Sequence, residues 1–276
     1  MKFRATAAVP MAATILAMSL VLIAPGRMAA QARPAEPAGP FQRLSDGKPN
    51  LQGYWQTRNG FTAFDVEEHK EPEFGIPAGK GVVTDPADGK VPYQPWALEK
   101  RKDILEHHLF DDPQAHCFLS GVPRQMYTPF GFQILQPPGY VVILYEAFHS
   151  FRIVPLDGRP HASDSIRMFE GDSRGHWEGD TLVIDVTNQN DKTWFDMAGN
   201  FHSDAIHVVE HYIPVDASTF RYEAIIEDPK VYSRPWTMSF LVGRTRTPNF
   251  EQMEFACVEG EQDLQHYVTD TGAPKK

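Results

Sequence analysis

The sequence predicts a mainly β protein in which an antiparallel meander closes into a barrel or folds as a sandwich. From residue 132 onward, short β-branched and aromatic runs alternate with turn signals about every 8 to 12 residues, as in all-β domains. Gly179 and the segment 216–218 mark tight hairpin turns between alternating strands. Because closure removes exposed sheet edges, a meander of this many strands tends to close.

The elements follow in order along the chain. A first strand is expected at 51–57, a long excursion without sustained periodicity at 59–91, which could act as a lid, and one helix at 95–108 that begins with Pro95. The later strands are expected at 132–136, 140–147, 150–156, 165–170, 175–178, 181–187, 206–213, 219–227, 237–244 and 252–258.

The N-terminus has the features of a secretory signal. Lys2 and Arg4 precede the apolar run 11–24, and Ala30-Gln31-Ala32 fits a cleavage site. A retained anchor is the alternative, but the run is shorter than the ~20 residues that span a bilayer. We therefore expect a signal peptide at 1–32, a flexible linker at 33–48 and a single β-rich domain at 49–276. The mature protein would be periplasmic or secreted, without a stable membrane anchor.

Charge and cysteine content limit the partners and the compartment. The net charge is −10, and removal of Lys2, Arg4 and Arg27 with the signal makes it −13. Such a surface repels nucleic acid, so a small molecule is the expected partner. In an oxidising compartment the two cysteines, Cys117 and Cys257, are expected to form a disulfide, with two buried thiols as the alternative.

Three segments carry a resemblance to known proteins. They are DGRPH (157–161), GDSRGHWEGDTLVIDV (171–186) and CFLSGVPRQM (117–126). They resemble a large family of secreted bacterial proteins of unassigned function, which implies no particular catalytic residue. Separately, Gly53-Tyr54-Trp55 resembles the Gly-x-Trp signature of lipocalin-like barrels, which implies a lipocalin-like barrel with Trp55 packed across its closed end. An ordinary core tryptophan is the alternative.

Histidines raise the question of a metal site. His207 and His211 belong to an H-x-x-E-H string, which binds zinc only on a helix. The apolar β-branched flanks favour a strand, where the two side chains would lie about 13 Å apart. No dedicated metal site is therefore assigned. A divalent ion held inside a barrel by His202 and His207 with His149 or His176 stays open as an alternative.

The preferred chemistry is acid-base catalysis without a cofactor. Glu146 ends an apolar run, and a carboxylate there needs a partner, for which Arg152 is the nearest candidate. Glu146 or His149 would accept a proton while Arg152 stabilises a developing oxyanion. A purely structural ion pair between Glu146 and Arg152 is the alternative.

A second group of candidates lies in the polar connection 190–207. His202 and His207 are further catalytic candidates there, since such loops carry binding groups on a rigid scaffold. A triad built on Ser203 is disfavoured, because the chain has no G-x-S-x-G elbow and no α/β alternation. Plain surface solvation is the alternative for this loop.

Aromatic residues provide candidates for binding a flat ligand. The candidates for substrate binding are Tyr127, Tyr145, Trp177, Trp194 and Trp236. No phosphate-binding glycine motif and no CxxCH string is present, so NAD, FAD, ATP and covalent haem are not expected.

Three functional hypotheses follow from these residues. The first is a cofactor-independent periplasmic lyase or isomerase that acts on a small apolar or aromatic molecule, for example a plant-derived phenolic. The second is a lipocalin-like carrier that binds an apolar ligand without changing it. The third is a metal-dependent hydrolase that uses barrel-lining histidines.

Overall fold

The computed structural model describes residues 39–245, 247, 249–255 and 257. The chain divides into a unit of residues 1–37 and a unit of residues 38–276, and only the second contains described residues. The predicted signal peptide at 1–32 therefore lies outside the described part of the chain. No described helix has the length and apolar character needed to cross a membrane.

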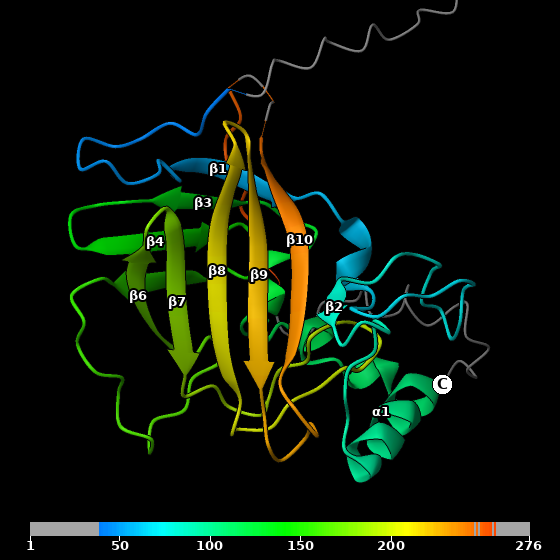
Figure 1. Ribbon diagram of the computed structural model, residues 1–276. Helices are drawn as coiled ribbons and strands as arrows, with labels where there is room; N and C mark the ends of the chain where they lie inside the picture. The colour runs from blue at the N-terminus through cyan, green and yellow to red at the C-terminus, as the bar shows by residue number, and fades with distance from the viewer. Residues whose placement is uncertain (1–38, 246, 248, 256, 258–276) are drawn as a thin grey trace, which may run out of the picture. The chain divides into compact units, whose positions relative to one another are not determined.

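A ten-stranded antiparallel sheet forms the body of the second unit and curves almost into a closed barrel (Figure 1). Nine strands follow the order β5-β4-β3-β1-β10-β9-β8-β7-β6, and β2 pairs with β10. The strands are β1 (Gly53–Thr57), β2 (Val83–Asp85), β3 (Phe132–Leu135), β4 (Tyr140–Tyr145), β5 (Phe151–Pro155), β6 (Asp172–Glu178), β7 (Thr181–Thr187), β8 (His207–Asp216), β9 (Thr219–Glu227) and β10 (Trp236–Arg244).

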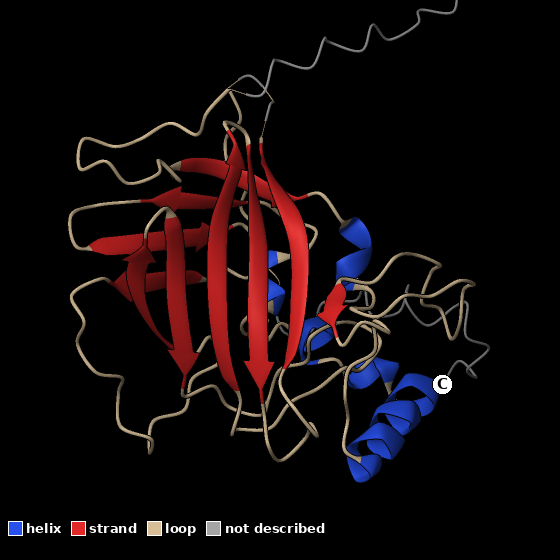
Figure 2. Ribbon diagram, in the orientation of Figure 1, coloured by secondary structure: helices blue, strands red, loops and turns tan. Residues whose placement is uncertain are grey.

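The helices lie toward one end of the barrel, where β9 ends and β10 begins (Figure 2). We call this the helix end. The single α-helix, α1 (Pro95–His107), has Pro95 in its first turn as expected. The short 3₁₀ helices are η1 (Gly60–Ala63), η2 (Leu109–Asp111), η3 (Pro113–His116) and η4 (Arg124–Met126).

Alternating side chains fill the barrel. On β9, residues Phe220, Tyr222, Ala224 and Ile226 are fully buried, and β8 and β10 alternate in the same way. A barrel of eight to nine strands is just wide enough for inward side chains to occupy its interior. The described residues therefore form a packed core inside the barrel.

Trp55 closes the end opposite the helices, which we call the Trp55 end. Its indole N–H donates to the Leu51 carbonyl at 2.7 Å, and its ring packs edge-on against Phe220. The Arg244 guanidinium lies over the indole, 4.2 Å from the ring centroid. Trp55 is thus a fully buried core residue at this end of the barrel.

One ion pair crosses the packed interior. Arg152 on β5 donates two hydrogen bonds to Glu210 on β8, at 3.0 and 2.5 Å, and both side chains are almost wholly buried. Tyr222 donates to the same carboxylate at 2.7 Å, and Arg152 also donates to Ser173 on β6 at 2.9 Å. Because β5 and β6 are the two unpaired edges of the sheet, Arg152 links the edges where backbone pairing is missing.

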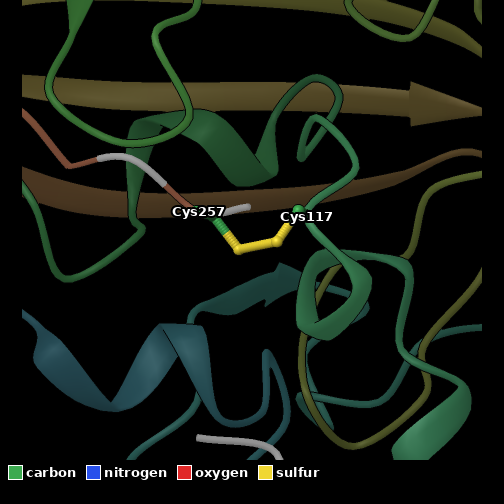
Figure 3. The surroundings of a disulfide bond; sticks show 2 residues. All are labelled: Cys117 and Cys257. Atoms are coloured by element: carbon green, nitrogen blue, oxygen red, sulfur yellow. A yellow bond between two sulfur atoms is a disulfide. The ribbon is translucent and has the colours of Figure 1, made fainter. Parts of the chain in front are cut away.

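The predicted disulfide joins Cys117, just after η3, to Cys257 near the C-terminal limit of the described residues (Figure 3). The bond spans 140 residues of chain. Cross-linking so long a loop restricts the unfolded chain and stabilises the folded state by several kcal/mol in the chain-entropy model, as a rough figure.

Most predicted strands are confirmed, and the differences have local causes. The strand predicted at 165–170 is wrong, because these residues form turns and bends, and only Met168 makes an isolated bridge with Gln189. The described part of 252–258 is not a strand either, and Phe255 makes one bridge with Ala147. The short β2 inside the predicted excursion 59–91 was not expected.

The described part of the predicted linker 33–48 makes ordered contacts. A turn is closed by the Leu44 N–H, which donates to the Lys48 carbonyl at 2.8 Å. Arg43 pairs with Asp180 in the β6–β7 hairpin.

Removal of Arg152 tests the role of the interior ion pair. We expect Arg152→Ala to lower the free energy of unfolding by about 3–5 kcal/mol, because it leaves the buried Glu210 charge without compensation. The double variant Arg152→Met with Glu210→Leu should recover much of this loss. Urea unfolding measures both. Arg43→Ala, which removes an exposed pair, is the matched control, and an equally small effect of Arg152→Ala would contradict the assignment.

Candidate functional site

The candidate site lies at the helix end, where the excursion 59–91, helix α1 and the loop 194–201 meet. Its centre is Asp65, which follows η1 and is fully buried. His69 lies four residues further along the same excursion. The segment predicted only as a possible lid therefore carries two titratable groups that are largely shielded from solvent.

Asp65 and His69 form a tight dyad. The His69 Nε2 lies 2.6 Å from Asp65 Oδ2, and the His69 side chain is 9% exposed. The backbone of His69 is fixed by reciprocal hydrogen bonds with Gly79, at 2.9 Å each. The other ring nitrogen, Nδ1, is buried and has no hydrogen-bond partner.

Asp65 is held from several directions. Arg101 of α1 donates to its Oδ2 at 3.0 Å. The Glu67 N–H and the Asn200 side-chain amide donate to its Oδ1 at 2.8 and 3.0 Å. Because these three donors fix the carboxylate, it accepts a hydrogen bond from the Nε2–H of His69 in one orientation.

A second buried carboxyl group, Asp196, lies beside the first. The Asn200 side-chain amide donates to Asp196 at 2.6 Å as well as to Asp65, and the Val66 N–H donates to Asp196 at 2.8 Å. Tyr93 donates to the Asn200 side-chain oxygen at 2.9 Å. Asn200 therefore bridges two carboxyl groups, and the charge of Arg101 acts on both of them.

Burial shifts the proton affinities of this cluster. Burial away from solvent raises the pKa of Asp65 to about 6, although the positive charge of Arg101 acts to lower it. Burial and the neighbouring Asp65 raise the pKa of Asp196 to about 8. Burial and the nearby Arg101 charge lower the pKa of His69 below its ordinary value. Around neutral pH, His69 is therefore uncharged.

This arrangement suits proton transfer at His69. A neutral histidine that donates through Nε2 to a carboxylate keeps a lone pair on Nδ1, which is the state of a general base. The carboxylate also stabilises the imidazolium that forms when Nδ1 takes up a proton. One aromatic ring lies beside the imidazole, with the Phe61 ring centroid 6.2 Å from that of His69.

The first predicted catalytic group is not brought together. Arg152 pairs with Glu210, so the predicted Glu146–Arg152 ion pair is wrong. Glu146 comes directly after β4 and continues the alternation of its half-buried side chains, Val142 and Leu144. Arg152, in contrast, points into the barrel, so the two side chains lie on different faces of the sheet. His149 is exposed and contacts Glu254 at 3.2 Å.

The predicted histidines of the second group also lie apart. His202 is buried, and its two ring nitrogens contact the Thr193 hydroxyl and the Ser203 carbonyl, at 2.7 and 2.9 Å. His207 is half-exposed on β8 and contacts Asp185 at 2.9 Å, which raises the pKa of His207. His149 and His176 are both exposed. Among the described residues, no three potential ligands gather into a metal-binding group.

The predicted substrate-binding aromatics divide into two sets. Tyr127, Tyr145 and Trp236 are buried in the core, where Tyr127 donates to the Phe195 carbonyl at 2.8 Å. Trp177 and Trp194 are half-buried and pack against the same core. None of the five hydrogen-bonds to Asp65 or His69 in the described part of the chain.

Sequence reasoning missed Asp65, His69 and Arg101. A carboxylate four residues before a histidine was present, but the segment 59–91 showed no periodicity that would place the two side chains together. The interaction depends on η1 and on the Gly79 bridge, neither of which has a local signature. Asp196 did fall within the polar loop that was singled out.

Comparisons with known proteins add no assignment: no family model, no curated protein and no solved structure matches this chain. The resemblance to secreted bacterial proteins therefore stays a prediction.

The pKa shifts predict a pH-dependent stability. A carboxyl group whose pKa is higher in the folded protein destabilises it as pH rises from the unfolded value near 4 to the folded value. This loss ends near pH 6 for Asp65, near pH 7 for the buried Glu170, and near pH 8 for Asp196. His69 has the opposite sign, but its effect is confined to pH values near and below its unfolded pKa of 6.5.

The Asp196→Asn variant removes the titration of Asp196 and so isolates its contribution to the pH dependence of stability. Between about pH 7 and pH 8, the wild-type protein should lose about 1 kcal/mol of stability that the variant does not lose. Urea unfolding at several pH values across this range measures the difference. Identical slopes in both proteins would show that Asp196 does not titrate there.

Proposed function

We propose that the protein is an exported enzyme that catalyses a proton-transfer reaction, an elimination or isomerisation, on a small apolar or aromatic molecule. The observation that carries this proposal is the Asp65–His69 dyad, whose buried Nδ1 has no hydrogen-bond partner. His69 would act as the base and Asp65 as the group that positions it. Arg101, whose charge already acts on His69, would stabilise negative charge that develops on the substrate.

Apolar side chains beside the dyad support the choice of substrate. Phe61, Leu109 and Met197 are partly buried against a small cluster of Ile76, Leu105 and Ala198. Phe61 packs closely over Gly79, where an added Cβ would lie 2.1 Å from its ring. Phe61 would therefore have to swing away from His69 to admit a flat ligand. A plant-derived phenolic is one concrete substrate of this class.

The alternatives from the sequence have less support. A lipocalin-like carrier needs space inside the barrel, whereas the described interior is filled by large buried side chains such as Tyr212, Phe220 and Tyr222. The metal-dependent hydrolase finds no ligand set among the described residues.

Turnover of a compound panel tests the proposal. We expect the mature protein to convert at least one small phenolic or terpenoid compound, followed by mass spectrometry. His69→Ala should reduce turnover by about 10²–10⁴-fold, because the general base is lost. The rate should fall at acidic pH as His69 becomes protonated.

The matched control is an exposed pair with the same spacing. His107 of α1 contacts Asp103 at 3.2 Å, also four residues earlier, but both are solvent-exposed. His107→Ala should leave turnover unchanged. Equal losses in both variants would contradict a specific role for His69. Ligand binding without turnover would favour the carrier.

A further inference from the structure

A pocket of about 370 Å³ lies outside the candidate site, between the end of β1 and the end of β10. Its lining comprises residues 56–58, residues 243–245 and Thr247. All of its side chains are polar or positively charged, and none is acidic. We infer that this pocket binds a small oxyanion, such as a carboxylate or phosphate group, between Arg58 and Arg244.

Arg244 forms the fixed side of the pocket. It donates to the Asn50 carbonyl at 2.6 Å, to the Ala217 carbonyl at 3.3 Å and to the Gln52 carbonyl. A guanidinium carries five N–H groups, so these three bonds leave donors available. The stack on Trp55 holds the guanidinium plane in place. Arg244 therefore offers a pre-oriented positive charge whose protein partners are neutral.

Arg58 forms the accessible side. It donates to the Thr219 hydroxyl at 3.0 Å and lies across Gly243, where an added Cβ would be 2.4 Å from its Nε. The pKa of Asp216 is lowered by hydrogen bonds from Ser218 and Thr219. The positive charge of Arg58 adds a smaller lowering, so the two side chains are close enough to interact. The pair does not reach salt-bridge distance in the described structure. Arg58 thus keeps most of its hydrogen-bonding capacity.

Elsewhere the arginines of this acidic protein are mostly neutralised. Arginines in salt bridges with a carboxylate are Arg43, Arg101, Arg124, Arg152, Arg159, Arg174 and Arg234. Arg167 and Arg221 also stand outside the salt bridges of the described chain, but they do not line this pocket. Two such guanidinium groups in one pocket create a local positive field in a chain with a net charge of −10.

The chemistry of the lining fits an oxyanion. Guanidinium groups bind carboxylate and phosphate oxygens through paired charge-assisted hydrogen bonds. Thr57, Thr245 and Thr247 also line the pocket and carry hydroxyl groups, which are neutral hydrogen-bond donors. The volume admits a small organic acid or an inorganic anion. The pocket shares no residue with the Asp65–His69 site, so the inference does not depend on the proposed catalytic function.

Titration with three probes at constant ionic strength tests the inference. Benzoate, inorganic phosphate and sulfate are added separately, and binding is followed by calorimetry and thermal shift. We expect at least one probe to bind saturably to the wild-type protein and to raise its Tm. Preference for benzoate identifies a carboxylate site, and preference for phosphate or sulfate identifies a site for a tetrahedral anion.

Two variants decide where the probe binds. Arg58→Ala should weaken binding about tenfold or more, because a charged donor is lost while the exposed residue contributes little to folding. Arg234→Ala removes an exposed arginine on the other end of β10 and should leave the affinity unchanged. Equal affinities in wild type and Arg58→Ala, or no saturable binding of any probe, would overturn the inference.

Discussion

One buried ion pair, Arg152–Glu210, bridges the open side of the incomplete barrel. The sheet begins at β5 and ends at β6, and these two edges have no backbone ladder between them. Arg152 extends from β5 to Glu210 on β8 and to Ser173 on β6, which ties the open side together through side chains. Further hydrogen bonds offset the cost of burying such a pair, and Tyr222 and Tyr212 supply hydroxyls to Glu210.

A filled interior moves any chemistry to the ends of the barrel. At the Trp55 end, Trp55 and Arg244 form a plug, in which the indole N–H and three of the five guanidinium N–H groups donate to main-chain carbonyls. At the helix end, three segments distant in sequence converge on Asp65, which receives hydrogen bonds from His69, Arg101 and Asn200. Because the barrel supplies a rigid base, these segments hold buried polar groups in a fixed arrangement that an isolated loop could not maintain.

The sequence predicted the barrel because its signals are local. Alternation along 219–227 and the turn at Gly179 depend on neighbouring residues alone, and both agree with the structure. The partner of Arg152 could not be predicted in the same way. Glu146 is close in sequence but follows the outward phase of β4, while Glu210 is 58 residues away and points inward. The dyad was missed for a related reason, since two of the groups that hold Asp65, Arg101 and Asn200, come from outside the segment.

Nitrogen-15 NMR of the His69 side chain tests most directly whether the dyad holds a free base. At neutral pH, the chemical shifts should report an uncharged ring with its proton on Nε2, bound to Asp65, and an unprotonated Nδ1. The pKa from the same titration should lie below that of an ordinary histidine. A ring protonated on Nδ1, or doubly protonated at neutral pH, would contradict the assignment of His69 as a proton acceptor.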